Sequence, residues 1–174
     1  MINRLFRNIL FFIILLLVQV LILDNLQISS YAVPFLYILF ILMLPFETPG
    51  WLLLILAFFT GFVMDLFQHT YGFHTAATVL MAWFRPGVLK LIIPQDGYVP
   101  NSEPRIHHYG FAWFMKYIVI LVFIHHAFLF YFEVFSFHHF FTTLFRVIIS
   151  ALFTVFLIIL SQFSVHKSKG FARG

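Results

Sequence analysis

Long apolar runs alternate with short polar connections along the whole chain. The runs lie at Ile9 to Leu23, Ile28 to Phe46, Trp51 to Phe67, Phe73 to Ile93, Ala112 to Phe132 and Phe141 to Leu160. A helix rises about 1.5 Å per residue and the hydrocarbon core of a bilayer is about 30 Å thick, so about 20 residues cross it. The pattern therefore predicts an all-α polytopic membrane protein with about six transmembrane helices, forming a single integral membrane domain over residues 1–174.

Two of these runs are interrupted. Pro34 and Pro45 bracket the second run, which leaves only ten strictly apolar residues between them, and Arg85, Pro86 and Gly87 interrupt the fourth. Proline removes a backbone donor and clashes with the preceding turn of a helix. We expect both spans to be kinked, tilted or partly interfacial.

Composition supports a membrane location. Of the 174 residues 63% are hydrophobic and 9% are charged, so the chain cannot present a water-compatible surface. Cysteine is absent, which rules out disulfides, thiolate metal sites and cysteine nucleophiles.

The basic residues indicate topology rather than nucleic-acid binding, although the net charge is +4. The three expected outer connections contain no Lys or Arg, and only Arg146 lies away from the expected inner side. The others lie near the N-terminus, the fourth connection or the C-terminus: Arg4, Arg7, Arg85, Lys90, Arg105, Lys116, Lys167, Lys169 and Arg173. With six spans, this places both termini in the cytoplasm.

The polar connections add two expectations. The basic start followed by an apolar run is similar to a signal peptide, but the nearest small-residue site, at Ala32, lies far beyond the run, so we expect an uncleaved first helix. The connection from Pro94 to Gly110 is either a solvated linker or a docking surface for a cytoplasmic partner.

Asp65 is a carboxylate inside an otherwise apolar run. A charge in hydrocarbon costs at least a few kcal/mol, so such groups usually face a protein partner or a wet cavity. Arg146 lies at a matching depth in the sixth run, and we expect an ion pair with Asp65, assisted by His74. The alternative is that both side chains reach the outer headgroups separately.

Six histidines are expected in the outer half of the molecule: His69, His74, His125, His126, His138 and His139. Imidazoles and carboxylates suit zinc. However, neighbours on a helix point about 100° apart, and no His-x-x-x-His spacing occurs, so we expect interfacial histidines and no metal or cofactor. No catalytic motif is present, and we expect no enzyme; an intramembrane acid and base pair of Asp65 and His74 is the alternative.

The stretch Gly61-x-x-x-Asp65, followed by Gly72-Phe73-His74-Thr75-Ala76, resembles the rod shape-determining protein MreD family. Chain length, six apolar segments and a basic start are also similar, as is Ala82-Trp-Phe-Arg85-Pro86. The resemblance implies a non-catalytic, multi-pass adaptor of the bacterial cytoplasmic (inner) membrane that serves cell elongation, rod shape and lateral peptidoglycan synthesis. Its implied partners are a bitopic MreC-type protein, MreB-type filaments acting indirectly, and the cell-wall glycosyltransferase and transpeptidase.

The family's fold is similar to the six-helix substrate-binding components of vitamin uptake systems. An inherited pocket would be lined by Asp65, His74 and Arg146. A substrate-binding membrane component for a vitamin or metal ion is therefore the alternative function, and proline-interrupted spans are consistent with it.

Small and polar residues are the candidates for structural or partner contacts, because small residues let helices approach closely in a membrane. They are Gly61, Asp65, Gly72, His74, Ala76, Ala77 and Arg146.

Overall fold

The computed structural model describes residues 2–25, 32–100, 102–135 and 140–171, with side chains described from residue 6 to residue 163 of these ranges. Every regular element in them is helical, which confirms the predicted all-α class. The elements are α1 (Ile2–Val18), the π-helical turn η1 (Gln19–Leu23), the 3-10 turn η2 (Leu36–Ile38), α2 (Leu39–Leu42), α3 (Gly50–Gln68), α4 (Phe73–Leu91), α5 (Ile106–Tyr109), α6 (Phe111–Val134) and α7 (Phe140–Phe171).

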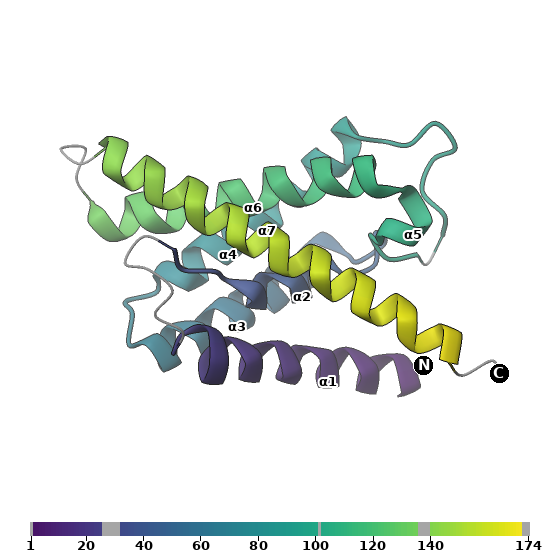
Figure 1. Cartoon of the computed structure of the whole chain (residues 1–174), viewed down its shortest axis with the longest axis horizontal. Coiled ribbons are helices and arrows are strands. Elements are labelled where there is room, and N and C mark those ends of the chain that lie inside the picture. Colours follow the sequence, from purple (N-terminus) through teal and green to yellow (C-terminus); the bar gives the residue numbers. More distant parts are fainter. Residues whose placement is uncertain (1, 26–31, 101, 136–139, 172–174) are drawn as a thin grey trace.

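The long helices run along the long axis of the molecule, and the start of α1 and the end of α7 lie at the same end (Figure 1). We call this the terminal end; it also carries α5 and the connection before it. The turn between α3 and α4 lies at the opposite, distal end. Helix α4 packs against both α3 and α6, and α6 packs against α7.

Within the part of the chain that the structure describes, four helices are long and apolar enough to cross a membrane: Phe6–Leu23, Gly50–Gln68, Phe111–Val134 and Phe140–Phe163. They correspond to the first, third, fifth and sixth predicted spans. Helix α4, the fourth predicted span, is 19 residues long but is not among them. The second predicted span is not a continuous helix among its described residues.

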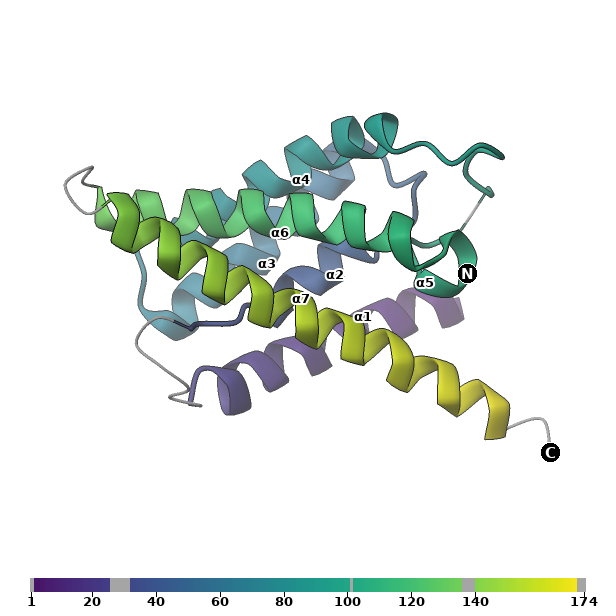
Figure 2. The same cartoon turned by 45° about the horizontal axis from the view of Figure 1, so that its top comes forward.

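The second span is instead a buried segment of mixed conformation, residues 32–46, which we call the broken segment. It is extended at first, forms η2 and the single turn α2, and continues without helix through Pro45 to Phe46. Figure 2 shows α2 enclosed by α3, α6, α7 and α1. Ile38, Leu39, Ile41 and Leu42 have no exposed surface. The broken segment is therefore the centre of the core.

Helix α4 continues through Pro86, so the expected interruption of the fourth span does not break the helix. Pro86 and Gly87 both lie on its exposed face. The Pro86 ring is thus exposed, and the helix tolerates the loss of one backbone donor at this position.

Candidate functional site

The turn between α3 and α4 is shaped by two residues in the left-handed region. His69 ends α3 with φ 54°, and Gly72 precedes α4 with φ 90°. Glycine adopts this conformation without the steric cost that other residues meet. Gly72 therefore allows α4 to fold back directly along α3.

Asp65 is buried on the last full turn of α3 and lies against the first turn of α4. Its Oδ1 accepts a hydrogen bond from the backbone N–H of His74 (3.0 Å) and its Oδ2 one from the N–H of Thr75 (2.9 Å). The hydroxyls of Thr70 and Thr75 also donate to it. A helix start has unpaired N–H groups and a positive dipole end, so the carboxylate both caps and neutralises it.

Gly61 lies one turn before Asp65 on the same face of α3, where the two helices are in backbone contact. A Cβ atom at Gly61 would lie 2.5 Å from the Cα of Thr75 and 2.6 Å from the carbonyl oxygen of His74. No such atom fits at those distances. Gly61, Asp65, Gly72 and His74 thus act together to join α3 and α4 into one hairpin.

A buried polar network continues inward from this hairpin, with Tyr37 of the broken segment at its centre. The Tyr37 hydroxyl lies 2.8 Å from His125 Nε2, 3.1 Å from His74 Nδ1 and 3.2 Å from Thr78 Oγ1. His74 Nε2 lies 2.8 Å from Gln68 Oε1, and Gln68 Nε2 donates to Asp24 (3.1 Å). Side chains from five segments of the chain therefore meet in this network: α3, α4, α6, the broken segment and the end of η1.

The donors in this network have one consistent direction when each imidazole carries one proton. The Gln68 oxygen can only accept, so His74 Nε2 carries the proton and His74 Nδ1 accepts from Tyr37. His125 Nε2 then donates to the Tyr37 oxygen. Donation thus runs from His125 through Tyr37, His74 and Gln68 to the exposed carboxylate of Asp24. Only His125 Nδ1, among the described atoms of this network, is buried without a partner.

His126 faces away from this network. Its Nδ1 bonds the carbonyl of Val122 (2.9 Å) and its Nε2 lies 3.0 Å from Thr154 Oγ1 on α7. No group of three metal-ligating side chains is found among the described residues. His138 and His139 lie outside the described residues.

The predicted ion pair between Asp65 and Arg146 is wrong. Arg146 pairs with Glu133 (3.3 Å) and lies over the ring of Phe130, 4.3 Å from its centroid. Asp65 finds its partners in the backbone and hydroxyls of α4 instead. Arg146 therefore does not join Asp65 and His74 in one cluster of contacts, as a pocket lined by the three residues would require.

The two alanines that follow the motif differ in exposure. Ala77 has no exposed surface, and Ala76 is half-buried. Ala77 is thus enclosed by the chain itself, and only Ala76 has surface left for contact with another molecule.

Sequence reasoning missed several interior polar residues, and Gln19, Tyr37 and Arg85 are the most consequential of them. Gln19 Oε1 accepts from the N–H of Leu36 (2.7 Å), and its Nε2 donates to the carbonyl of Pro34 (3.0 Å). Gln19 therefore replaces the helical hydrogen bonds that the extended start of the broken segment lacks. The signal in the sequence was a lone amide in an apolar run, next to a span that two prolines prevent from being helical.

Arg85 serves the other end of the broken segment. It is 1% exposed, although its charge and position suggested a cytoplasmic residue. Its Nε donates to the Tyr117 hydroxyl (2.7 Å), its Nη2 donates to the carbonyl of Leu44, and Tyr117 donates to the carbonyl of Leu42 (2.8 Å). A cation and a phenol thus satisfy carbonyls at the last residue of α2 and two residues beyond it.

The comparisons with known proteins give no relative: no family model, no curated protein and no solved structure matches the chain. The roles of these residues therefore follow from geometry. The interior groups bond one another and the backbone, and this is the chemistry of a fixed helical framework.

Proposed function

We propose that the protein is a non-catalytic membrane adaptor of the bacterial cell-elongation machinery, which packs against the transmembrane helix of a bitopic MreC-type partner. The observation that carries the proposal is that the buried polar side chains form hydrogen bonds with one another and with the backbone. The groups that would have to serve a substrate or a reaction are engaged with one another: Asp65 with the start of α4, and Tyr37 with His74 and His125.

A rigid interior suits an adaptor, because such a protein acts through the surfaces that it holds in place. Buried polar networks whose groups are paired fix one arrangement of the helices, and in this network only His125 Nδ1, among the described atoms, lacks a partner. The residues that the sequence shares with the MreD pattern, Gly61, Asp65, Gly72 and His74, then maintain the framework, and partner contacts fall on outward-facing positions.

Helix α1 is the first candidate for the partner-facing surface. In its span window 17% of the residues are buried, against 33% for α3 and α7 and 44% for α6. Exposed Ile13 and Leu17 lie on its outer side. Helices associate in lipid through close packing, so an outer helix with little internal contact can exchange lipid for a partner.

Depletion in the native host tests the proposed role. Cell width and the sites of new wall insertion are imaged while the protein is depleted, with and without vitamin and metal supplements. Rounding that no supplement corrects is the expected result. Normal shape with a growth defect that one nutrient repairs would refute the adaptor.

Site-specific photo-crosslinking tests the proposed surface. A photoreactive residue at Ile13 or Leu17 should capture a bitopic partner. At the matched exposed positions Leu152 and Phe156 of α7 it should capture lipid. Equal capture of the partner from both helices would remove α1 from this role.

A second candidate, a substrate-binding component for a vitamin or metal ion, is favoured by the broken segment. Transporters often place interrupted helices at their binding sites. In that case a ligand would raise the unfolding temperature of the purified protein, and the increase would grow with the logarithm of the ligand concentration above the Kd.

A further inference from the structure

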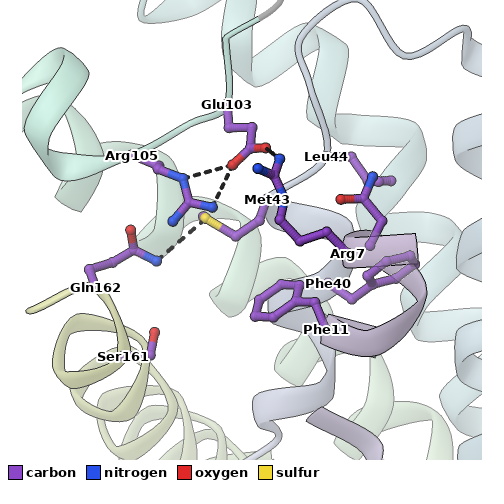
Figure 3. A pocket seen from close by; sticks show the side chains of 10 residues that line it. Arg7, Phe11, Phe40, Met43, Leu44, Glu103, Arg105, Ser161 and Gln162 are labelled. Carbon is purple, nitrogen blue, oxygen red and sulfur yellow. Dashed lines mark hydrogen bonds and ion pairs between the residues drawn. The ribbon is translucent and has the colours of Figure 1, made fainter. Parts of the chain in front are cut away.

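A cleft of about 200 Å³ opens at the terminal end, between α1, the broken segment, α7 and the connection before α5. Its floor is apolar and its rim is charged (Figure 3). Phe11 and Phe40 line the floor, and Arg7, Glu103 and Arg105 line the rim. Figure 2 shows α1 and α7 diverging toward this end.

The rim carries two cations and one anion. Glu103 bridges them: Arg7 Nη2 donates to its Oε1 (2.9 Å), and Arg105 donates to its Oε2 through Nε (2.7 Å) and Nη2. A guanidinium has five N–H donors, so most donors of both arginines remain available for a further anion. The cluster keeps one net positive charge. The Arg7 side chain is 61% exposed, which leaves it free to turn toward a ligand.

Gln162 provides a second polar group on the α7 side of the cleft. It is 9% exposed, and its amide nitrogen donates to the sulfur of Met43 (3.5 Å). A thioether is a weak acceptor, so the Gln162 amide can still donate a stronger hydrogen bond to a ligand. In Figure 3 its nitrogen points across the cleft toward Met43, below the arginines.

The cleft lies beside the ends of two candidate membrane spans, where a spanning helix would meet the lipid headgroups. Arg7 is at the first turn of the span Phe6–Leu23, and Gln162 is at the last turn of the span Phe140–Phe163. Aromatic side chains cluster at the same end, where Phe46 stacks on Tyr98 with centroids 4.3 Å apart and contacts Trp113. Amphipathic aromatic rings favour the membrane interface.

We propose that this cleft binds one anionic phospholipid. The phosphodiester lies between Arg7 and Arg105, the Gln162 amide donates to the headgroup, and an acyl chain passes over Phe11 and Phe40 toward the bilayer. Basic pockets between helices at the membrane surface recognise such headgroups. The assignment rests on the cleft alone and does not depend on the adaptor role.

Native mass spectrometry of the detergent-purified full chain tests the proposal. It is titrated with phosphatidylglycerol, with phosphatidylcholine of the same acyl chains, and with inorganic phosphate. We expect one phosphatidylglycerol per chain, bound at least about fivefold more tightly than phosphatidylcholine, since one basic residue contributes about a factor of five at an anionic surface. Equal affinity for the two lipids, or equal occupancy by inorganic phosphate, would overturn it.

Two substitutions at the rim should change the affinity for phosphatidylglycerol in opposite directions. Arg7→Gln should weaken phosphatidylglycerol binding about fivefold, and Glu103→Gln should strengthen it by a similar factor, because it removes the competing carboxylate. Lys90→Gln is the matched control, since Lys90 is exposed near the same end but does not line the cleft. It should leave binding unchanged.

Each variant is first checked for an unchanged elution volume in size-exclusion chromatography and an unchanged helical circular dichroism spectrum. A loss of binding is then measured on folded protein only. If both rim variants weaken binding in equal measure while remaining folded, the cluster has only a structural role and the proposal is wrong. An effect of Lys90→Gln equal to that of Arg7→Gln would also overturn it, because binding would then reflect net charge.

Discussion

Asp65 is satisfied by the peptide groups at the start of α4 and not by a basic side chain. The sequence correctly indicated that this carboxylate faces protein. The sequence could not identify the partner. The unpaired N–H groups at a helix start bind a carboxylate as well as a guanidinium does, but no charged residue marks them in the sequence. For the same reason hydropathy placed Arg85 at the surface, although Tyr117 and the Leu44 carbonyl hold it inside.

Replacing Asp65 should therefore destabilise the hairpin. Asp65→Ala leaves two backbone N–H groups and two hydroxyls without their acceptor, and we expect a loss of about 2–4 kcal/mol. The free energy of unfolding in mixed micelles measures it. Asp96→Ala, at an exposed loop position, is the matched control and should change stability by less than about 0.5 kcal/mol. Equal effects would mean that the capping bonds contribute nothing.

The contact at Gly61 gives a second prediction at the residue scale. Gly61→Ala forces a methyl group against the backbone of Thr75, so α3 and α4 must separate, at a cost of about 1–3 kcal/mol. Gly87→Ala is the control, because a Cβ there meets nothing within 4 Å. That substitution within α4 should be neutral or stabilise by up to about 1 kcal/mol. Thermal unfolding of both variants measures the contrast.

The broken segment is the element that departs most from a simple helical span. Pro34 and Pro45 correctly indicated an interruption. Apolar composition alone could not distinguish a kinked helix from an extended start followed by short turns, since both bury the same residues. The difference lies in the hydrogen bonds that Gln19, Ser150 and Thr154 supply to peptide N–H groups of the segment that have no helical partner.

We therefore expect Gln19 to be required for the stability of the broken segment. Gln19→Leu keeps the volume but leaves the Leu36 N–H and the Pro34 carbonyl unpaired in the core, so we expect a loss of about 2–4 kcal/mol. Gln95→Leu in the exposed connection is the control. Limited proteolysis and thermal unfolding report the outcome, and unchanged resistance of Gln19→Leu would contradict the role assigned to the amide.

At the scale of the whole molecule, the start of α1 and the end of α7 share one end (Figure 1). The distribution of basic residues predicts that this end faces the cytoplasm. The chain has no cysteine, so a single introduced cysteine is the only residue of this protein that a maleimide labels. A membrane-impermeant maleimide added to intact cells should label Tyr71→Cys at the distal end and leave His108→Cys unlabelled until the cells are opened. The opposite pattern would invert the orientation.

The contact between α3 and α4 also bears on how the protein enters the membrane. Helix α4 is not among the helices apolar enough to cross alone, and it carries His74, Arg85 and Lys90. Its partner α3 is apolar enough, and the two are joined by a tight turn with the carboxylate of one already bonded to the start of the other. During biogenesis α4 would therefore leave the insertion machinery together with α3, as a preassembled pair.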